Sequence, residues 1–167
     1  SKSDFYLFPY WKVMEIVMDR NEAQSALDAV RDADRRMAKR MTWPFQRHAL
    51  FGVGEGLIVM AMGLTGFDRI GAAGAGVALL LSLMYQDKQR YGMFVSGWRG
   101  KATKPLTVAM TVLALAAMAL NYFVFRWEDG TNPAVVITAI VTAAILTWGS
   151  IRWQTIYQRE LRDGDLA

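Results

Sequence analysis

The sequence contains no cysteine and only one histidine among its 167 residues. Without cysteine the chain forms no disulfide, no thiolate zinc site, no iron–sulfur cluster and no cysteine nucleophile. A single histidine excludes a histidine-rich metal site and a haem held by two histidines of one chain. We therefore expect no metal and no other cofactor, and no group of residues resembles a catalytic arrangement.

Charge is also scarce over long parts of the chain. Residues 49–67, 70–85, 105–125 and 133–151 together number 75 and include one charged side chain, that of Glu55. Helices of water-soluble proteins mix charged and apolar residues, because each helix shows one face to water. The separation of charged and apolar residues into blocks therefore predicts an integral membrane protein.

The four apolar stretches predict an all-α membrane bundle made of two helical hairpins. The third and fourth stretches have 21 and 19 residues, which is enough to cross roughly 30 Å of hydrocarbon at about 1.5 Å per residue. The first is long enough but carries Glu55, and the second has only 16 residues. Since only Asp68 and Arg69 separate these two, we expect a tight turn there.

Lysine and arginine residues predict the orientation of the bundle. Seventeen of the 19 lie in residues 1–48, 86–104 and 152–167, whereas the turns at 68–69 and 126–132 hold one each. Positively charged segments stay in the cytoplasm. We therefore expect a membrane protein with both termini and the middle loop in the cytoplasm. The first apolar stretch begins only after 48 residues, which is too far from the N-terminus for the apolar region of a cleavable signal peptide.

We expect residues 1–42 to form a helical extension on the cytoplasmic side. The membrane domain is expected to cover residues 43–167. Past Pro9, apolar residues at helical spacing predict an amphipathic helix. This helix would lie on the inner leaflet or pack on protein. A second helix is expected over residues 21–42, and its narrow apolar seam suits packing within the chain or a weak coiled coil.

Basic side chains gather beside the expected inner membrane surface. They are candidates for contact with anionic lipid headgroups or a protein partner, and the alternative is that they only fix the orientation. These candidates are Arg35, Arg36, Lys39, Arg40, Arg47, Arg90, Arg99 and Lys101. Nucleic acid is not expected as a partner, because the net charge is only +4 and acidic residues share the same helix.

Glu55 is the strongest candidate for a functional residue. An ionisable residue at membrane depth is costly and usually marks a pathway or a polar partner. The helical rise predicts a polar layer of Glu55, Thr111 and Thr147, with His48 at its cytoplasmic mouth. The alternatives are a protonated Glu55 bonded across the helices, or a carboxylate that reaches back to water. For His48, a hydrogen-bonded interfacial role is favoured over ligation of a haem or pigment.

Glycines predict close helix packing. Gly52 and Gly56 form a GxxxG pair in the first apolar stretch, and Gly71 and Gly74 open the second. Small residues allow helix backbones to approach in lipid, so we expect this contact within the first hairpin, with a homodimer seam as the alternative. Asn121 is expected to bond to a neighbouring helix.

Two segments carry a resemblance to known proteins. ALDAVRDADRRMAKRMTWP (26–44) and RYGMFVSGWRG (90–100) resemble segments of small bacterial integral membrane proteins with no assigned function. The resemblance implies four spans, a charged N-terminal helix and a basic central loop, in a protein of bacterial origin. It implies no catalytic residue.

The leading functional hypothesis is a non-enzymatic accessory or interaction protein in a membrane assembly, with a membrane protein or a second copy as partner. It depends on the absence of catalytic residues and on two cytoplasmic surfaces, residues 1–42 and 86–104. The rival is a small dimeric transporter or channel that couples to protons or cations through Glu55. A lipid-modifying enzyme with a headgroup held near His48 and Arg47 comes third.

Overall fold

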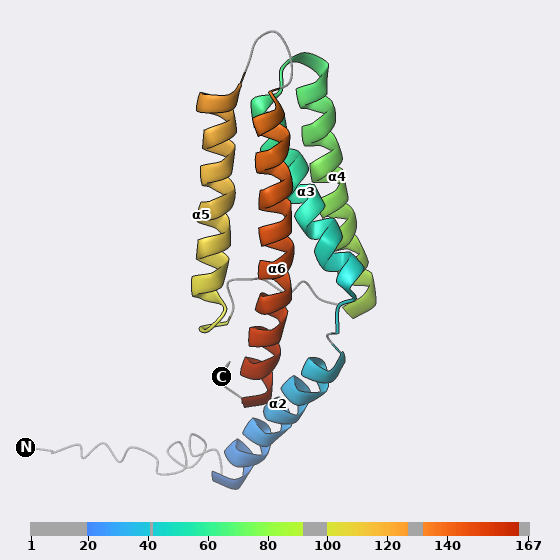
Figure 1. The fold of residues 1–167 in the computed structure, drawn as a ribbon. Coiled ribbons are helices and arrows are strands. Elements are labelled where there is room, and N and C mark those ends of the chain that lie inside the picture. The colour runs from blue at the N-terminus through green and yellow to red at the C-terminus, as the bar shows by residue number, and fades with distance from the viewer. Residues whose placement is uncertain (1–19, 41, 92–99, 127–131, 164–167) are drawn as a thin grey trace, which may run out of the picture.

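The computed structural model describes residues 20–40, 42–91, 100–126 and 132–163, and every regular element in these ranges is helical (Figure 1). The segment before Arg20, where we expected an amphipathic helix, lies outside the described residues. The elements are α2 (Arg20–Arg40), α3 (Phe45–Gly63), α4 (Gly66–Tyr91), α5 (Lys104–Leu120), the π-helical turn η1 (Asn121–Phe125) and α6 (Pro133–Asp163).

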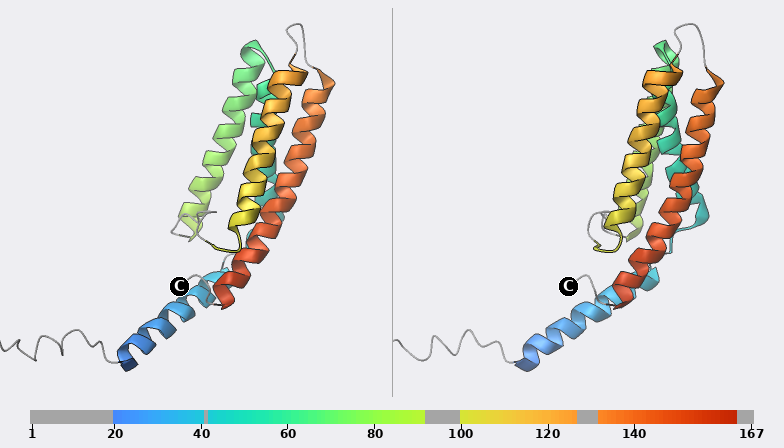
Figure 2. Two further views of the ribbon diagram at one scale, coloured as in Figure 1. Left: turned by 90° about the vertical axis from the view of Figure 1, so that its left-hand side faces the viewer. Right: turned by 60° about the vertical axis from the view of Figure 1, so that its left-hand side comes forward.

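Helices α3 to α6 run alongside one another, with α3 and α6 in contact along the bundle (Figures 1 and 2). Helix α4 packs on α3 alone among the described helices, whereas α5 contacts both α3 and α6. Helix α2 lies outside the bundle at an angle and touches the C-terminal part of α6. The all-α class and the helix predicted near residues 21–42 are therefore confirmed.

The first hairpin turns earlier in the chain than the sequence predicts. Helix α3 ends at Gly63, and Leu64 after it is extended, with φ −90° and ψ 164°. Gly66 opens α4 with a φ of +59°, a conformation that glycine adopts without steric cost. Asp68 then lies in the first turn of α4, where its negative charge interacts favourably with the helix dipole. The turn predicted at Asp68 and Arg69 is therefore wrong.

Three of the described helices are long and apolar enough to cross a membrane, rather than the predicted four. They are the segments Gly66–Arg90, Lys104–Phe125 and Pro133–Asp163. Helix α3 falls short because it begins at Phe45 and takes in Gln46, Arg47 and His48, while ending before the last apolar residues of its stretch. These polar residues lower the mean hydropathy of α3. Within the bundle, α3 nevertheless contacts all three of the other helices.

The other helices of the bundle expose large apolar side chains on their outer faces. Ile70 on α4, Val112 on α5 and Ile140 on α6 are 68%, 59% and 63% exposed. A protein in water rarely displays so much contiguous apolar surface, whereas lipid tails solvate it. These faces, together with the three apolar helices, are those of a membrane protein.

Close packing between α3 and α6 depends on glycines of α3. A Cβ atom on Gly52 would collide with the hydroxyl of Thr147, and one on Gly56 would lie 2.9 Å from the Cβ of Ala143. A Cβ on Gly63 would collide with Val135. The GxxxG pair therefore brings α3 against α6, which is not its hairpin partner.

Within the hairpin, α3 and α4 approach each other closely at other glycines. A Cβ atom on Gly76 of α4 would lie 2.7 Å from the carbonyl oxygen of Gly54. Gly71 and Gly74, expected at this contact, have no atom of another element within 4 Å of an added Cβ. They face away from α3, so the prediction that they pack within the hairpin is not met, and the seam between two copies stays a prediction.

These environments make a matched pair of glycine variants informative. Gly52→Ala should lower the thermal unfolding temperature in detergent, because overpacking against Thr147 costs about 1–3 kcal/mol. Gly71→Ala adds a methyl group in open space and should leave the temperature unchanged or raise it, since alanine favours helix by about 1 kcal/mol. Circular dichroism of both purified variants measures this, and equal stability of the two would contradict the packing.

Candidate functional site

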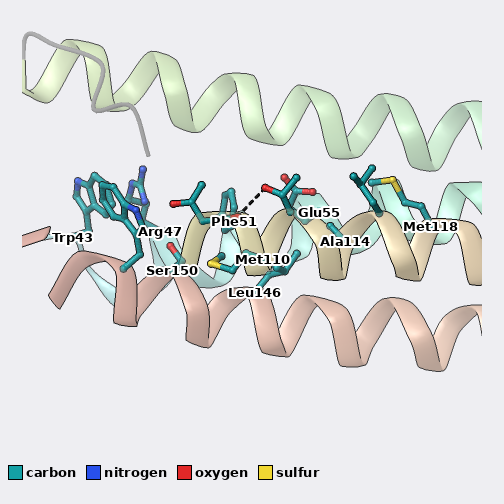
Figure 3. A pocket seen from close by; sticks show the side chains of 13 residues that line it. Trp43, Arg47, Phe51, Glu55, Met110, Ala114, Met118, Leu146 and Ser150 are labelled. Carbon is teal, nitrogen blue, oxygen red and sulfur yellow. Dashed lines mark hydrogen bonds between the residues drawn. The ribbon is translucent and has the colours of Figure 1, made fainter. Parts of the chain in front are cut away.

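A cavity of about 340 Å³ lies between α3, α5 and α6, in the part of the bundle nearer α2 (Figure 3). Its polar lining groups are the side chains of Arg47, Glu55, Thr107, Thr111 and Ser150. The remaining lining is apolar or aromatic. Its volume lies at the small end of the range of about 300–1,000 Å³ found for ligand pockets.

Glu55 lies in the middle of this cavity, with Phe51 on one side and Met118 further along on the other (Figure 3). The neighbouring glycines explain its direction. Gly52 faces α6 and Gly54 faces α4, so the helical period turns Glu55 toward α5. The side chain is half-buried, and among the described residues it has no hydrogen bond or ion pair.

The predicted polar layer is only partly assembled. Thr111 lines the cavity with Glu55, and its hydroxyl donates to the carbonyl oxygen of Thr107 at 2.9 Å (Figure 3). Thr147 lies outside the lining, because it packs against Gly52 on another face of α3. Its hydroxyl donates to the backbone of its own helix at 2.8 Å. Thr147 therefore does not join Glu55 and Thr111 in the cavity.

His48 joins α3 to α6 and does not line the cavity. Its Nδ1 is 2.8 Å from the hydroxyl oxygen of Ser150, and its Nε2 is 2.7 Å from Oε1 of Gln154. The ring is 2% exposed. Both nitrogens are engaged by protein groups, so His48 fits the favoured interpretation of a hydrogen-bonded histidine, with neither nitrogen free for a haem or pigment.

Arg47 is held at the end of the cavity nearest α2. Its guanidinium forms an ion pair with Asp87 of α4, and both side chains are less than one fifth exposed. The same guanidinium lies 3.4 Å above the ring centroid of Trp43. The charge of Arg47 is thus compensated, which leaves Glu55 as the charged lining group without a partner.

Aromatic rings continue from this ion pair toward the end of α6. Trp43 stacks on Trp153 with centroids 5.8 Å apart, and Trp153 stacks on Tyr157 at 4.9 Å. The indole nitrogens of Trp43 and Trp153 are buried without a hydrogen-bond acceptor. Ala38 of α2 packs on the same cluster, so α2 is fixed to the bundle through α6.

The basic candidates for headgroup contact fall into separate groups. Arg47 is paired inside the bundle, and Arg35 lies 3.8 Å from Asp32 on the surface of α2. Exposed candidates are Arg36, Lys39, Arg90 and Lys101. Arg99 and the side chain of Arg40 lie outside what the structure describes.

The ends of α5 are each fastened by a buried polar group. At the end distant from α2, the amide of Asn121 donates to the carbonyl oxygen of Val59 at 2.9 Å, which confirms its expected bond to a neighbouring helix. At the other end, Glu160 of α6 is 5% exposed and accepts a short hydrogen bond from the backbone of Ala102. Gly100 leaves room for this carboxylate.

Sequence reasoning missed Asp87 and Glu160. Both lie in charged segments beside apolar stretches, where a carboxylate ordinarily faces water, and Glu160 is surrounded by other charged residues. The only available signal is geometric: Glu160 lies one helical turn beyond Tyr157 and two turns beyond Trp153, on the same face of α6. That face is identifiable only after its packing partners are known.

The chain matches no protein-family model, and comparisons with curated proteins and with solved structures find none similar to it. Its class therefore follows from the fold and the site alone. Helices α5 and α6, which are apolar and long enough to span a membrane, line together with α3 a cavity that contains a carboxylate without a partner among the described residues. This is a helical membrane protein with a polar site inside the bundle.

The ion pair at the cavity end can be measured by a double-mutant cycle. Arg47→Gln and Asp87→Asn should show a coupling of about 1–3 kcal/mol in unfolding, because the pair is largely buried. The exposed pair Arg31–Asp28 on α2, at 3.6 Å, serves as the control and should couple by about 0.5 kcal/mol or less. A coupling at Arg47 and Asp87 as small as in the control would contradict the burial of the pair.

Proposed function

We propose that the chain crosses a bacterial inner membrane four times, through α3 to α6, with both termini in the cytoplasm. The limited apolarity of α3 is compatible with this, because α4, α5 and α6 all pack against it, which buries His48 and leaves Arg47 and Glu55 only partly exposed. The basic helix α2 and the C-terminal end of α6 lie at the same end of the bundle as the start of α5 (Figure 1). The excess of positive charge in these segments supports a cytoplasmic location for that end.

Within that topology, we infer that the protein is a small transporter or channel that couples to a proton or cation at Glu55. The observation that carries this proposal is the Glu55 carboxylate, which lies in a cavity between the helices and has no hydrogen bond or ion pair among the described residues. An intramembrane carboxylate without a structural partner typically belongs to an ion or substrate pathway. If Glu55 had bonded across the helices, the structural alternative would have been favoured instead.

The cavity gives the proposed pathway a direction. One end of the cavity, at Trp43, lies at the end of the bundle that we assign to the cytoplasm, and the lining extends from there to Met118 of α5. Beyond it, the bond from Asn121 to Val59 closes α5 against α3. A cation from the cytoplasm therefore reaches Glu55 first, and passage to the opposite side requires α5 to separate from α3 near Asn121.

A second copy of the chain would fit the small-residue face of α4. Gly71, Gly74 and Ala75 are exposed there, and small residues in lipid favour helix association. A dimer through α4 would leave the cavity on the other side of α3 unobstructed. This arrangement is compatible with a small dimeric transporter.

The accessory or interaction function is the second candidate. It is favoured by α2, whose Leu27 and Val30 are 46% and 51% exposed on a helix that projects from the bundle (Figure 2). In that function Glu55 would have no transport role. Isolation of the protein from native membranes without any stoichiometric partner would count against this candidate.

The transport proposal is tested in liposomes that contain the purified protein and a pH-sensitive dye. Glu55→Gln should abolish protein-dependent proton movement driven by an imposed pH or cation gradient, because the amide has no charge to exchange. Glu22→Gln is the matched control, since Glu22 lies exposed in the first turn of α2, and it should retain the wild-type rate. Equal flux in wild type and Glu55→Gln would overturn the proposal.

A further inference from the structure

The lining of the cavity is divided along its length. At the end nearest α2 are the rings of Trp43, Phe51 and Trp153, and at the other end are the thioether and methyl groups of Met118 and its neighbours (Figure 3). Glu55 lies between these two apolar parts. The Glu55 carboxylate is thus flanked by groups that favour an apolar ligand.

We propose that the Glu55 cavity binds an amphiphilic organic cation, with its ammonium group at the carboxylate and its apolar body between α3 and α5. The inference deepens the proposed function, because it names the class of cation that Glu55 would take.

The positive charge of the proposed ligand follows from the pairing of the charged residues that line the cavity. Arg47 is the other charged residue of the lining, and Asp87 already compensates it. The net field in the cavity is therefore that of the Glu55 carboxylate. An anionic ligand would meet this carboxylate without a free positive group beside it, which costs several kcal/mol when like charges are juxtaposed.

The lining also distinguishes an organic cation from a metal ion. Calcium takes about six to eight oxygen ligands, whereas the cavity offers one carboxylate and the hydroxyls of Thr107, Thr111 and Ser150. No group of three or more His, Cys, Asp or Glu side chains in the described ranges has the arrangement of a metal site. An ammonium with apolar substituents needs fewer oxygen contacts, and aromatic faces such as that of Phe51 attract it through their quadrupole.

The size of the cavity limits the ligand. A volume of about 340 Å³ accommodates one aromatic ring with a small ammonium group and leaves no room for a large drug-like molecule. Arg47, which is paired with Asp87, and the ring of Trp43 line the cavity at the end nearest α2.

The test uses benzyltrimethylammonium and neopentylbenzene, which have the same shape but differ in one charge, because carbon replaces nitrogen. Each is titrated calorimetrically into the full-length protein in a non-ionic detergent. Wild type should bind the cation at least about tenfold more tightly than the neutral analogue, which is about 1.4 kcal/mol, since only the cation gains the contact with the carboxylate charge. Equal affinity for both molecules, or no saturable binding of the cation, would overturn the inference.

Variants then assign the charge to Glu55. Glu55→Gln should reduce the affinity for benzyltrimethylammonium by about tenfold or more and leave that for neopentylbenzene unchanged. Glu55→Asp keeps the charge and should still bind benzyltrimethylammonium more tightly than neopentylbenzene. If Glu55→Gln does not fold, this variant provides the test, and equal affinity for the two molecules in Glu55→Asp would overturn the inference. Glu22→Gln, on the exposed surface of α2, should bind as wild type does. An unchanged affinity in a folded Glu55→Gln variant would overturn the inference.

The two proposals fail in different ways. Glu55-dependent proton flux without binding of benzyltrimethylammonium would overturn the organic-cation site and leave the proposed transport intact. Glu55-dependent binding without any Glu55-dependent flux would support the site and overturn the transport function.

Discussion

Gly52, Gly56 and Gly63 bring the backbone of α3 so close to α6 that a Cβ atom added at any of them would collide with atoms of α6. This contact fixes the rotation of α3, and the remaining faces of the helix follow from the helical period. Gly54 turns to α4, and Glu55 turns toward α5. Because the glycine face cannot be exchanged for another without steric collision, the carboxylate is held in the cavity and kept out of lipid.

The cavity exists because α5 packs less closely than α6. Helix α5 is fastened at its two ends, through Asn121 to Val59 and through the backbone of Ala102 to Glu160. Between these anchors the side chains of α5 and α3 leave about 340 Å³ unfilled around Glu55. Burial of polar groups at both ends costs free energy unless they are hydrogen-bonded, so these bonds hold α5 in position while the middle of the helix remains separated from α3.

Much of the fold is predictable from the sequence because lipid imposes a simple rule. Apolar stretches of spanning length become helices, and the positions of α4, α5 and α6 follow from it. The partners of individual residues are not predictable in this way. Gly56 was assigned to the hairpin although it packs on α6, and Thr147 was matched to Glu55 by depth although it faces elsewhere. Such errors arise because periodicity defines the faces of a helix without identifying which neighbour covers each face.

The proposed function requires that Glu55 gives the cavity a negative charge and that water reaches the cavity from the end of the bundle assigned to the cytoplasm. Since the chain has no cysteine, single cysteines can be labelled without background. Thr111→Cys in the lining and Val112→Cys on the outer face of α5 are treated in inverted vesicles with cationic and anionic methanethiosulfonates of matched size. We predict that Thr111→Cys alone reacts, faster with the cationic reagent, and that Glu55→Gln removes this preference. Equal rates with the two reagents, or an unreactive Thr111→Cys, would contradict the account.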